Sequence, residues 1–302
     1  MAEDLKSIIT PTLLTHIATS RIPHGKAESL DFSQIGRETF KECHFDTDIK
    51  EQAWPALVAM SKVGLDDFPD PLTFLPEPSS PEFPEQSFGL TLLLDQGARI
   101  FCKGIDARWS ACYFDVIAQR LAAALRALPE EQRPDTPSRW EKDVGASLDY
   151  WLITRFWFGA VWVHSESREN QKIALAYMEE TRKIVEEATG KTDPNREKRS
   201  EILSDTTTFP FLYRQGPPEG DNVTLADYAF FMCKLMDVHY PIIEKFGRYP
   251  YRNRITGRQT TDEELAWLDK VDHLGEAPAE IGEKIKEDIE NGVWAPLGSG
   301  LT

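Results

Sequence analysis

Apolar residues recur along this chain mainly at the three- and four-residue spacing of an α-helix. The clearest case is the 114–128 range, where one face is apolar and Pro129 ends the pattern. The 173–188 range repeats this spacing and is followed by Gly190, which suits the left-handed turn that closes many helices. Both ranges are therefore predicted to be amphipathic helices.

Two other ranges are too apolar to leave a polar face. The 88–101 range carries three consecutive leucines and then Asp95, Gln96 and Arg99, so we expect a buried helix that ends in polar groups. The 140–163 range is dense in tryptophan and phenylalanine, and its length favours a buried helix over a strand.

Turn and capping signals separate the predicted helices. Thr224 with Asp227 predicts a capped helix start, and Pro241 is expected to break or kink that helix near His239. Two overlapping capping boxes open the next predicted helix. They are Thr260 with Glu263, and Thr261 with Glu264.

The N-terminal third gives weaker signals. Residues 1–30 have little pattern, and we expect a partly ordered extension there. The 32–63 range favours helix, with Pro55 expected in a first turn. The 66–86 range is rich in proline and acidic residues, which predicts an irregular surface loop.

Because helix signals recur and no long range alternates apolar and polar residues, the predicted fold class is all-α. We divide the chain into an N-terminal extension and proline-rich loop packed on the core (1–87), a helical domain (88–290) and a tail (291–302).

Composition sets limits on compartment and partners. The chain has 302 residues, a net charge of -16 and no long apolar segment or signal-peptide pattern, so we expect a soluble, cytoplasmic protein. Its four cysteines are widely spaced and indicate neither a disulfide framework nor a zinc site. No phosphate-binding loop or hydrolase motif is present, and we expect no cofactor and no metal. The acidity argues against broad adhesion to nucleic acid or to a membrane, and we expect no membrane partner.

One segment contradicts this acidity. Residues 244–258 contain Lys245 and four arginines but a single glutamate, which gives this segment a net charge of +4. Such a patch suits an anionic partner, although the arginines could equally pair with the protein's own carboxylates. The four are Arg248, Arg252, Arg254 and Arg258.

Candidate chemistry lies at the ends of predicted helices. His164, Ser165 and Glu166 bring a base, a hydroxyl and a carboxylate together in sequence, but adjacent helical residues diverge by about 100° and cannot form a triad by themselves. A partner is required, and His239 or Asp95 is the candidate. Alternatively, His164 and Ser165 cap the aromatic helix, and His239 satisfies a carbonyl that Pro241 frees.

Asp95 and Arg99 share a helix face because they are four residues apart. They could form a simple intrahelical pair, or Asp95 could bind a guanidinium group. The cysteines are more typical of packing residues than of nucleophiles, because no basic neighbour is evident.

Three blocks of sequence together resemble the DUF924 family. They are LLLDQGARIF (92–101), VHSES (163–167) with Asn170 and Gln171, and HYPIIEKFGRYPYRN (239–253) with Gly257, Arg258, Thr260 and Thr261. The family implies an all-α, TPR-like fold. It also implies a functional surface made by Asp95, Gln96, Arg99, His164, Ser165, Glu166, His239, Arg248, Arg252, Asn253 and Arg258.

The chain departs from the family pattern in several places. Gly97-Ala98-Arg99 stands where the family has a proline-arginine pair, and Tyr249-Pro250-Tyr251 stands where it has Phe-Pro-His. The family's N-terminal block is not evident before residue 88, and the 191–222 linker is long.

In these departures the chain is similar to a longer, fungal branch associated with arginine-containing cyclodipeptide synthases. That resemblance implies transfer of aminoacyl groups from tRNA, including arginyl-tRNA, to form an arginine diketopiperazine. The arginine loop would hold phosphates, Asp95 or Glu166 would bind the substrate guanidinium, and His164 or His239 would deprotonate an amine or Ser165. The alternatives are a small-molecule enzyme that binds a carboxylate or phosphate, and a TPR-like binding module without chemistry.

Overall fold

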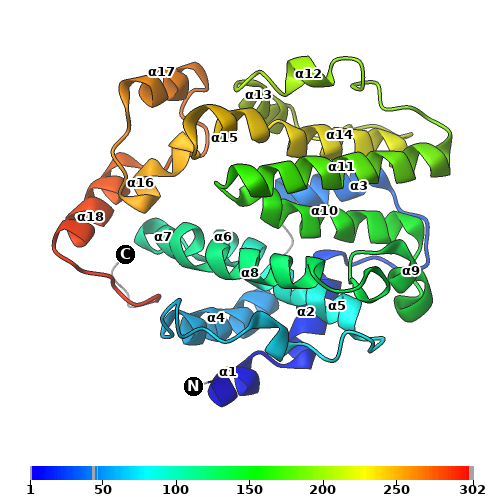
Figure 1. The fold of residues 1–302 in the computed structure, drawn as a ribbon, viewed down its shortest axis with the longest axis horizontal. Coiled ribbons are helices and arrows are strands. Elements are labelled where there is room, and N and C mark those ends of the chain that lie inside the picture. Colours follow the sequence, from blue (N-terminus) through cyan, green and yellow to red (C-terminus); the bar gives the residue numbers. More distant parts are fainter. Residues whose placement is uncertain (1, 43–44, 46, 299–302) are drawn as a thin grey trace.

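The computed structural model describes residues 2–42, 45 and 47–298, and these residues form helices with no β-strand. The helices stack in successive layers from the N-terminal helices at the bottom, through α10, α11, α14 and α15, to α12, α13 and α17 at the top (Figure 1). This all-α array confirms the predicted fold class. None of the described helices is long and apolar enough to span a membrane.

The N-terminal residues form part of the core. Helices α1 (Ala2–Ile8) and α2 (Pro11–Arg21) both pack on α4 (Thr47–Ser61), and α2 also crosses α5 (Phe83–Leu92). Leu14 and Ile17 of α2 are fully buried. The prediction of a partly ordered extension at 1–30 is therefore wrong, because a short apolar face with little periodicity gains its burial from neighbouring helices.

Two local predictions in the N-terminal third need correction. Pro55 lies inside α4 and not in a first turn. The 66–86 range is a loop only in part, because it contains a 3₁₀ turn (Pro71–Phe74) and the start of α5 at Phe83. A further short helix, α3 (Phe32–Arg37), is capped by Asp31, whose side chain accepts hydrogen bonds from the backbone N–H groups of Ser33 and Gln34.

The predicted buried helix at 88–101 is continuous but irregular. After α5, a π-helical turn (Leu93–Gly97) leads into α6 (Ala98–Phe101). Such turns widen the backbone and redirect side chains, and they occur frequently at functional sites. A second π turn (Ser110–Phe114) precedes α8 (Asp115–Arg126), which is the predicted amphipathic helix.

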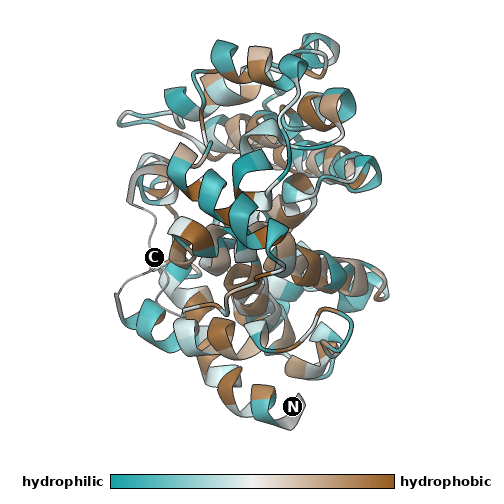
Figure 2. Cartoon of the chain, turned by 90° about the vertical axis from the view of Figure 1, so that its left-hand side faces the viewer, coloured by the Kyte–Doolittle hydropathy of each residue, from teal (hydrophilic) through white to brown (hydrophobic). Residues whose placement is uncertain are grey.

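The aromatic helix α10 (Leu148–His164) lies at the centre of the molecule. It packs on α5, α8, α14 and α11 and buries nearly all of its side chains, as predicted. Hydrophobic residues are more frequent among the inner helices, and hydrophilic residues are more frequent toward the outside of the molecule (Figure 2). The 140–147 part of the predicted helix instead forms a separate π turn (Trp140–Val144) that ends at Gly145, whose φ is 72°.

The upper layer carries the predicted caps. Helix α11 (Arg168–Thr189) ends at Gly190 in the left-handed conformation, and α14 (Leu225–Asp237) begins with the Thr224–Asp227 capping box. His239 lies between α14 and α15 (Tyr240–Phe246), where Pro241 starts a new helix. The long linker contains the short helices α12 (Arg199–Ile202) and α13 (Thr208–Gln215).

The C-terminal elements complete one side of the molecule. They are α16 (Asn253–Thr256), α17 (Asp262–Lys270) and α18 (Ala279–Glu290), and α16 packs on α18. Of the two predicted capping boxes, α17 uses Thr261 with Glu264. Short helices α7 (Ala107–Trp109) and α9 (Pro137–Arg139) connect the larger ones.

Candidate functional site

The central feature of the site is a carboxylate–imidazole pair. Asp95 lies in the π turn after α5 and His164 is the last residue of α10, and the distance from His164 Nδ1 to Asp95 Oδ1 is 2.7 Å. Because an ionised carboxylate only accepts hydrogen bonds, Nδ1 carries the proton and donates it. No described residue hydrogen bonds Nε2, so this nitrogen keeps a free lone pair.

A chain of charges continues from this pair. Arg99 donates to Asp95 (3.4 Å) and to Asp115 (2.5 Å), and the other oxygen of Asp115 accepts from Arg252 (3.2 Å). Arg252 also donates to the carbonyl oxygen of His164 (2.9 Å) and lies 4.7 Å from the Tyr249 ring centroid. The network thereby ties together α6, α8, α10 and the arginine loop.

Electrostatics sets the protonation of the pair. Burial opposes ionisation of Asp95, but His164 and Arg99 outweigh it and hold the pKa of Asp95 well below its usual range. Burial, reinforced by Arg99 and opposed by Asp95, lowers the pKa of His164. The favoured state at neutral pH is therefore an aspartate that orients a neutral imidazole, which is the arrangement of a general base.

His239 is a second buried imidazole close to the first. Its Nδ1 donates to the carbonyl oxygen of Leu235 (2.8 Å), and its ring lies 4.1 Å from the Phe209 centroid. Burial, followed by the proximity of His164, lowers the pKa of His239 to about 3. The predicted structural role, satisfying a carbonyl before Pro241, is therefore present, and the ring remains neutral at physiological pH.

Both histidines line a cavity of about 580 Å³. Its walls are mainly apolar and aromatic, and several polar side chains line it as well. No aspartate or glutamate occurs among the described residues that line it. The polar lining residues there include Gln96, Arg99, Lys103, Ser110, Tyr251 and Arg252.

Ser165 and Glu166 do not join the imidazole. Ser165 Oγ donates to Gln119 (3.1 Å) and accepts from Asn170 (2.9 Å). Glu166 accepts two hydrogen bonds from Arg258 (2.5 and 3.0 Å) and one from the amide of Tyr249 (2.9 Å). Among the described residues no hydrogen bond joins Ser165 Oγ to His164 or His239, so the alternative in which one of these histidines deprotonates Ser165 has no geometric support.

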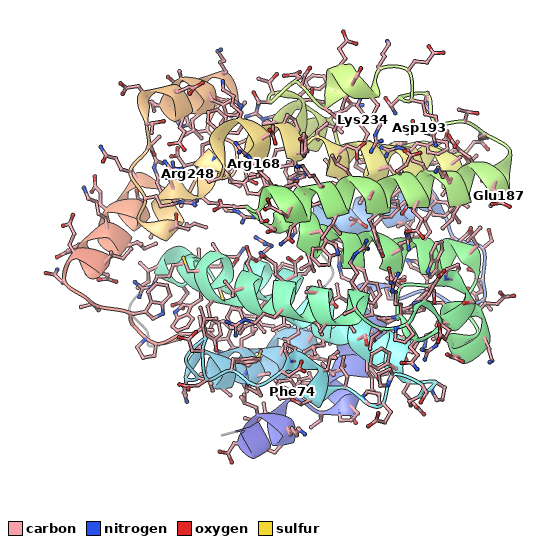
Figure 3. The ribbon with its side chains drawn as sticks, viewed as in Figure 1. Phe74, Arg168, Glu187, Asp193, Lys234 and Arg248 are labelled. Carbon is pink, nitrogen blue, oxygen red and sulfur yellow. The ribbon has the colours of Figure 1, made fainter. Side chains whose placement is uncertain are left out.

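Each arginine of the loop has a carboxylate partner. Arg248, which lies between α15 and α16 (Figure 3), donates to both oxygens of Glu264. Arg254 lies 3.1 Å from Glu276. Arg252 and Arg258 pair with Asp115 and Glu166, as described above. The alternative of internal pairing is therefore confirmed.

The Arg248–Glu264 pair anchors the loop to α17, because Glu264 belongs to that helix. Arg248 contributes most to lowering the pKa of Glu264 to about 2. Asn253 is buried and donates to Glu264 (3.2 Å) and Thr260 (3.3 Å), so it supports α17 and does not face a cavity. Gln96 donates to Asp95 (2.5 Å) while lining the large cavity.

Sequence reasoning missed three residues of the site. Asp115 links two arginines, Tyr249 donates to the carbonyl oxygen of Val163 (2.5 Å), and Tyr251 stacks on Tyr249 with centroids 5.2 Å apart. Asp115 begins α8 with no motif around it, so only the crossing of helices reveals it. The departure Tyr-Pro-Tyr was the one available signal for the two tyrosines.

The remaining candidates are inert or unsupported. Burial raises the pKa of Cys102 to about 12 and of Cys112 to about 11, while Cys233 is buried against Arg182. Cys43 lies outside the described residues. Within the described part of the chain, no cluster of His, Cys, Asp and Glu has the geometry to hold a metal ion.

Comparison with known proteins adds one match. Searches among curated proteins and among solved structures found no match for this chain. One family model, described as "Bacterial protein of unknown function (DUF924)", matches residues 33–272, which extends well upstream of the three blocks that carry the resemblance. Because the match spans most of the 302 residues, the chain belongs to the DUF924 family.

Proposed function

We propose that this protein is an aminoacyl-tRNA-dependent synthase that joins arginine to a second amino acid as a cyclic dipeptide. The observation that carries the proposal is the Asp95–His164 pair, whose imidazole lies beside Arg252 at the edge of the large cavity. This arrangement provides a base for an attacking amine and cations for the oxyanion that forms when an ester carbonyl is attacked.

The reaction would proceed by direct aminolysis. His164 Nε2 takes a proton from the α-amine of one aminoacyl group. At the same time the nitrogen of that amine attacks the ester carbonyl carbon of the other aminoacyl group. The new C–N bond forms, the ester C–O bond breaks, and the proton passes to the leaving ribose oxygen. A second aminolysis by the remaining amine closes the ring and releases the second tRNA. A direct route is favoured because Ser165 Oγ is committed to Gln119 and Asn170.

The test is product formation from defined substrates. The purified protein is incubated with arginyl-tRNA and a mixture of other aminoacyl-tRNAs, and arginine diketopiperazines are measured by mass spectrometry. We expect product from the wild type, and a loss of about 100-fold or more in His164→Gln because the general base is missing. His273→Gln is the matched control, since His273 is an exposed histidine that does not line the cavity. Absence of any diketopiperazine from the wild type would overturn the proposal.

A second candidate is an enzyme acting on a small carboxylate or phosphate without tRNA. It is favoured by the internal pairing of the loop arginines, which leaves this loop no uncompensated cationic patch for tRNA phosphates. Arg99, Lys103 and Arg252 would bind the anionic group inside the cavity.

Gel-shift experiments separate the two candidates. The binding of arginyl-tRNA and of the same tRNA without its arginyl group is compared at two salt concentrations, because phosphate contacts weaken steeply with salt. A salt-sensitive shift supports the synthase, and no binding even at low salt supports the small-molecule enzyme.

A further inference from the structure

His164 and Arg252 line two cavities at once. One is the cavity of about 580 Å³ described above, and the other has a volume of about 220 Å³ and lies toward α8 and the Ser165–Ser167 turn. The general base and the adjacent guanidinium therefore lie between two separate spaces. A group bound in either one could reach the same imidazole.

The two cavities differ in the hydrogen-bonding groups that line them. The small cavity is lined by the acidic residues Asp115 and Glu166 together with Gln119. The large cavity is lined by Arg99 and Lys103, and none of its described lining residues is acidic. Asp115 and Glu166 already pair with arginines, so the small side differs from the large one by offering carboxylate acceptors to a cationic donor, while the large side offers donors to an oxygen acceptor.

The carboxylates of the small cavity retain acceptor capacity. Each oxygen of Asp115 accepts one hydrogen bond, from Arg99 and from Arg252 respectively, while a carboxylate offers about four lone-pair sites. A volume of about 220 Å³ also exceeds the roughly 30 Å³ that one water molecule occupies in the liquid. The space therefore suits the end of a flexible cationic chain.

The large cavity has the opposite chemistry. Trp157, Phe209 and Tyr251 contribute aromatic faces, and Phe209 and Tyr251 stack with centroids 6.2 Å apart. Such walls bind a flat apolar group, and Arg99, which also lines the cavity, would bind a carbonyl or carboxylate oxygen of the same ligand.

We propose that the two cavities are separate subsites, in which the small one binds a guanidinium or amino group and the large one binds an aromatic group that carries an oxygen acceptor. This inference rests on the proposed function, because it assigns one subsite to each amino acid that the base would join. It also replaces the sequence-based expectation that Asp95 binds the substrate guanidinium, since Asp95 lies behind His164 and lines neither cavity.

The test uses two small probes and isothermal titration calorimetry. Agmatine carries a guanidinium on a flexible chain and probes the small cavity, and 3-phenylpropionate probes the large one. Ala111 lines only the small cavity and Ala107 only the large one, and both are half-buried, so their leucine variants form a matched pair. Ala123→Leu, on the exposed face of α8, is the control.

We expect Ala111→Leu to weaken agmatine binding at least tenfold without changing 3-phenylpropionate binding, and Ala107→Leu to do the reverse. Thermal unfolding of each variant checks that it is folded. In the wild type, saturation with one probe should leave the affinity for the other within threefold.

Several results would overturn the inference. They are no agmatine binding to the wild type, competition between the two probes, or equal effects of both leucine variants on both probes. The wild-type competition decides the matter even if a variant fails to fold. These assays need no tRNA, so the two proposals can fail separately. Independent binding of the two probes without diketopiperazine formation would reject the proposed function alone. Diketopiperazine formation by a protein on which the two probes compete would reject the two subsites alone.

Discussion

Replacing His239 by glutamine should make the protein's stability less sensitive to acid. His239 is buried against Phe209 and close to His164 and Arg252, so protonation would place a new positive charge among groups that already disfavour it. Its pKa is lowered from an ordinary 6.5 to about 3. Between these two values the unfolded chain binds a proton that the folded chain does not, so folded stability falls as the pH falls from 6.5 toward 3.

The size of this effect follows from the two pKa values. Lowering the pH from 7 to 5 removes about 2 kcal/mol of unfolding free energy through His239 alone, because each pH unit in this window contributes up to about 1.4 kcal/mol. His164 also has a lowered pKa and adds a loss in the same direction, in the wild type and in the variant. The informative quantity is therefore the difference between the two proteins.

Urea unfolding at pH 7 and at pH 5 measures this difference in unfolding free energy between the wild type and His239→Gln. The wild type should lose about 2 kcal/mol more than His239→Gln over this interval. A constant offset caused by the lost hydrogen bond to Leu235 cancels in the comparison. His273→Gln serves as the control for an exposed histidine. An identical pH dependence in wild type and His239→Gln would refute the assignment of a buried, neutral His239.

Three further substitutions test the site and its supports. Asp95→Asn should lower the rate of diketopiperazine formation by about 100-fold or more while leaving probe binding in both cavities intact, because the imidazole loses its orienting carboxylate. If the variant formed the product at the wild-type rate, the pair would be excluded as the base. Tyr249→Phe should cost about 1 kcal/mol of unfolding free energy in urea titrations, since its hydroxyl bonds Val163 and Gln171, and no loss would show those bonds to be dispensable. Gly89→Ala should cost about 3 kcal/mol, because its Cβ would lie 2.0 Å from the Leu14 carbonyl oxygen; Gly64→Ala, with ordinary space, is the control, and equal stability of the two would contradict the close α2–α5 approach.

The local pattern of the chain determined most of the helical elements. The amphipathic spacing of α8 and α11, the Gly190 cap and the capping boxes at Thr224 and Thr261 depend on residues within a few positions of one another. Such signals are written in the sequence because helix geometry fixes which nearby residues meet. The pairing of Asp95 with Arg99 was predicted on the same ground and occurs at 3.4 Å.

Signals failed where local and tertiary demands differ. The apolar residues of α2 show little helical pattern, yet contact with α4 and α5 buries them. The π turns at 93–97 and 110–114 have no sequence signature of their own, although they carry Asp95 and Ser110 into the site. The geometry of these π turns depends on the tertiary packing of the helices before and after them.

Which charges pair was decided only by the tertiary structure. The sequence by itself determined an acidic helical protein with one basic loop, and left two uses for its arginines, a ligand or internal carboxylates. Folding resolved this by bringing Asp115 and Glu166 to Arg252 and Arg258 from far along the chain, while His164 met Asp95 across 69 positions. An ion pair forms where helix crossings bring opposite charges within a few ångströms in a poorly solvated space, and that distance cannot be obtained from residue order alone.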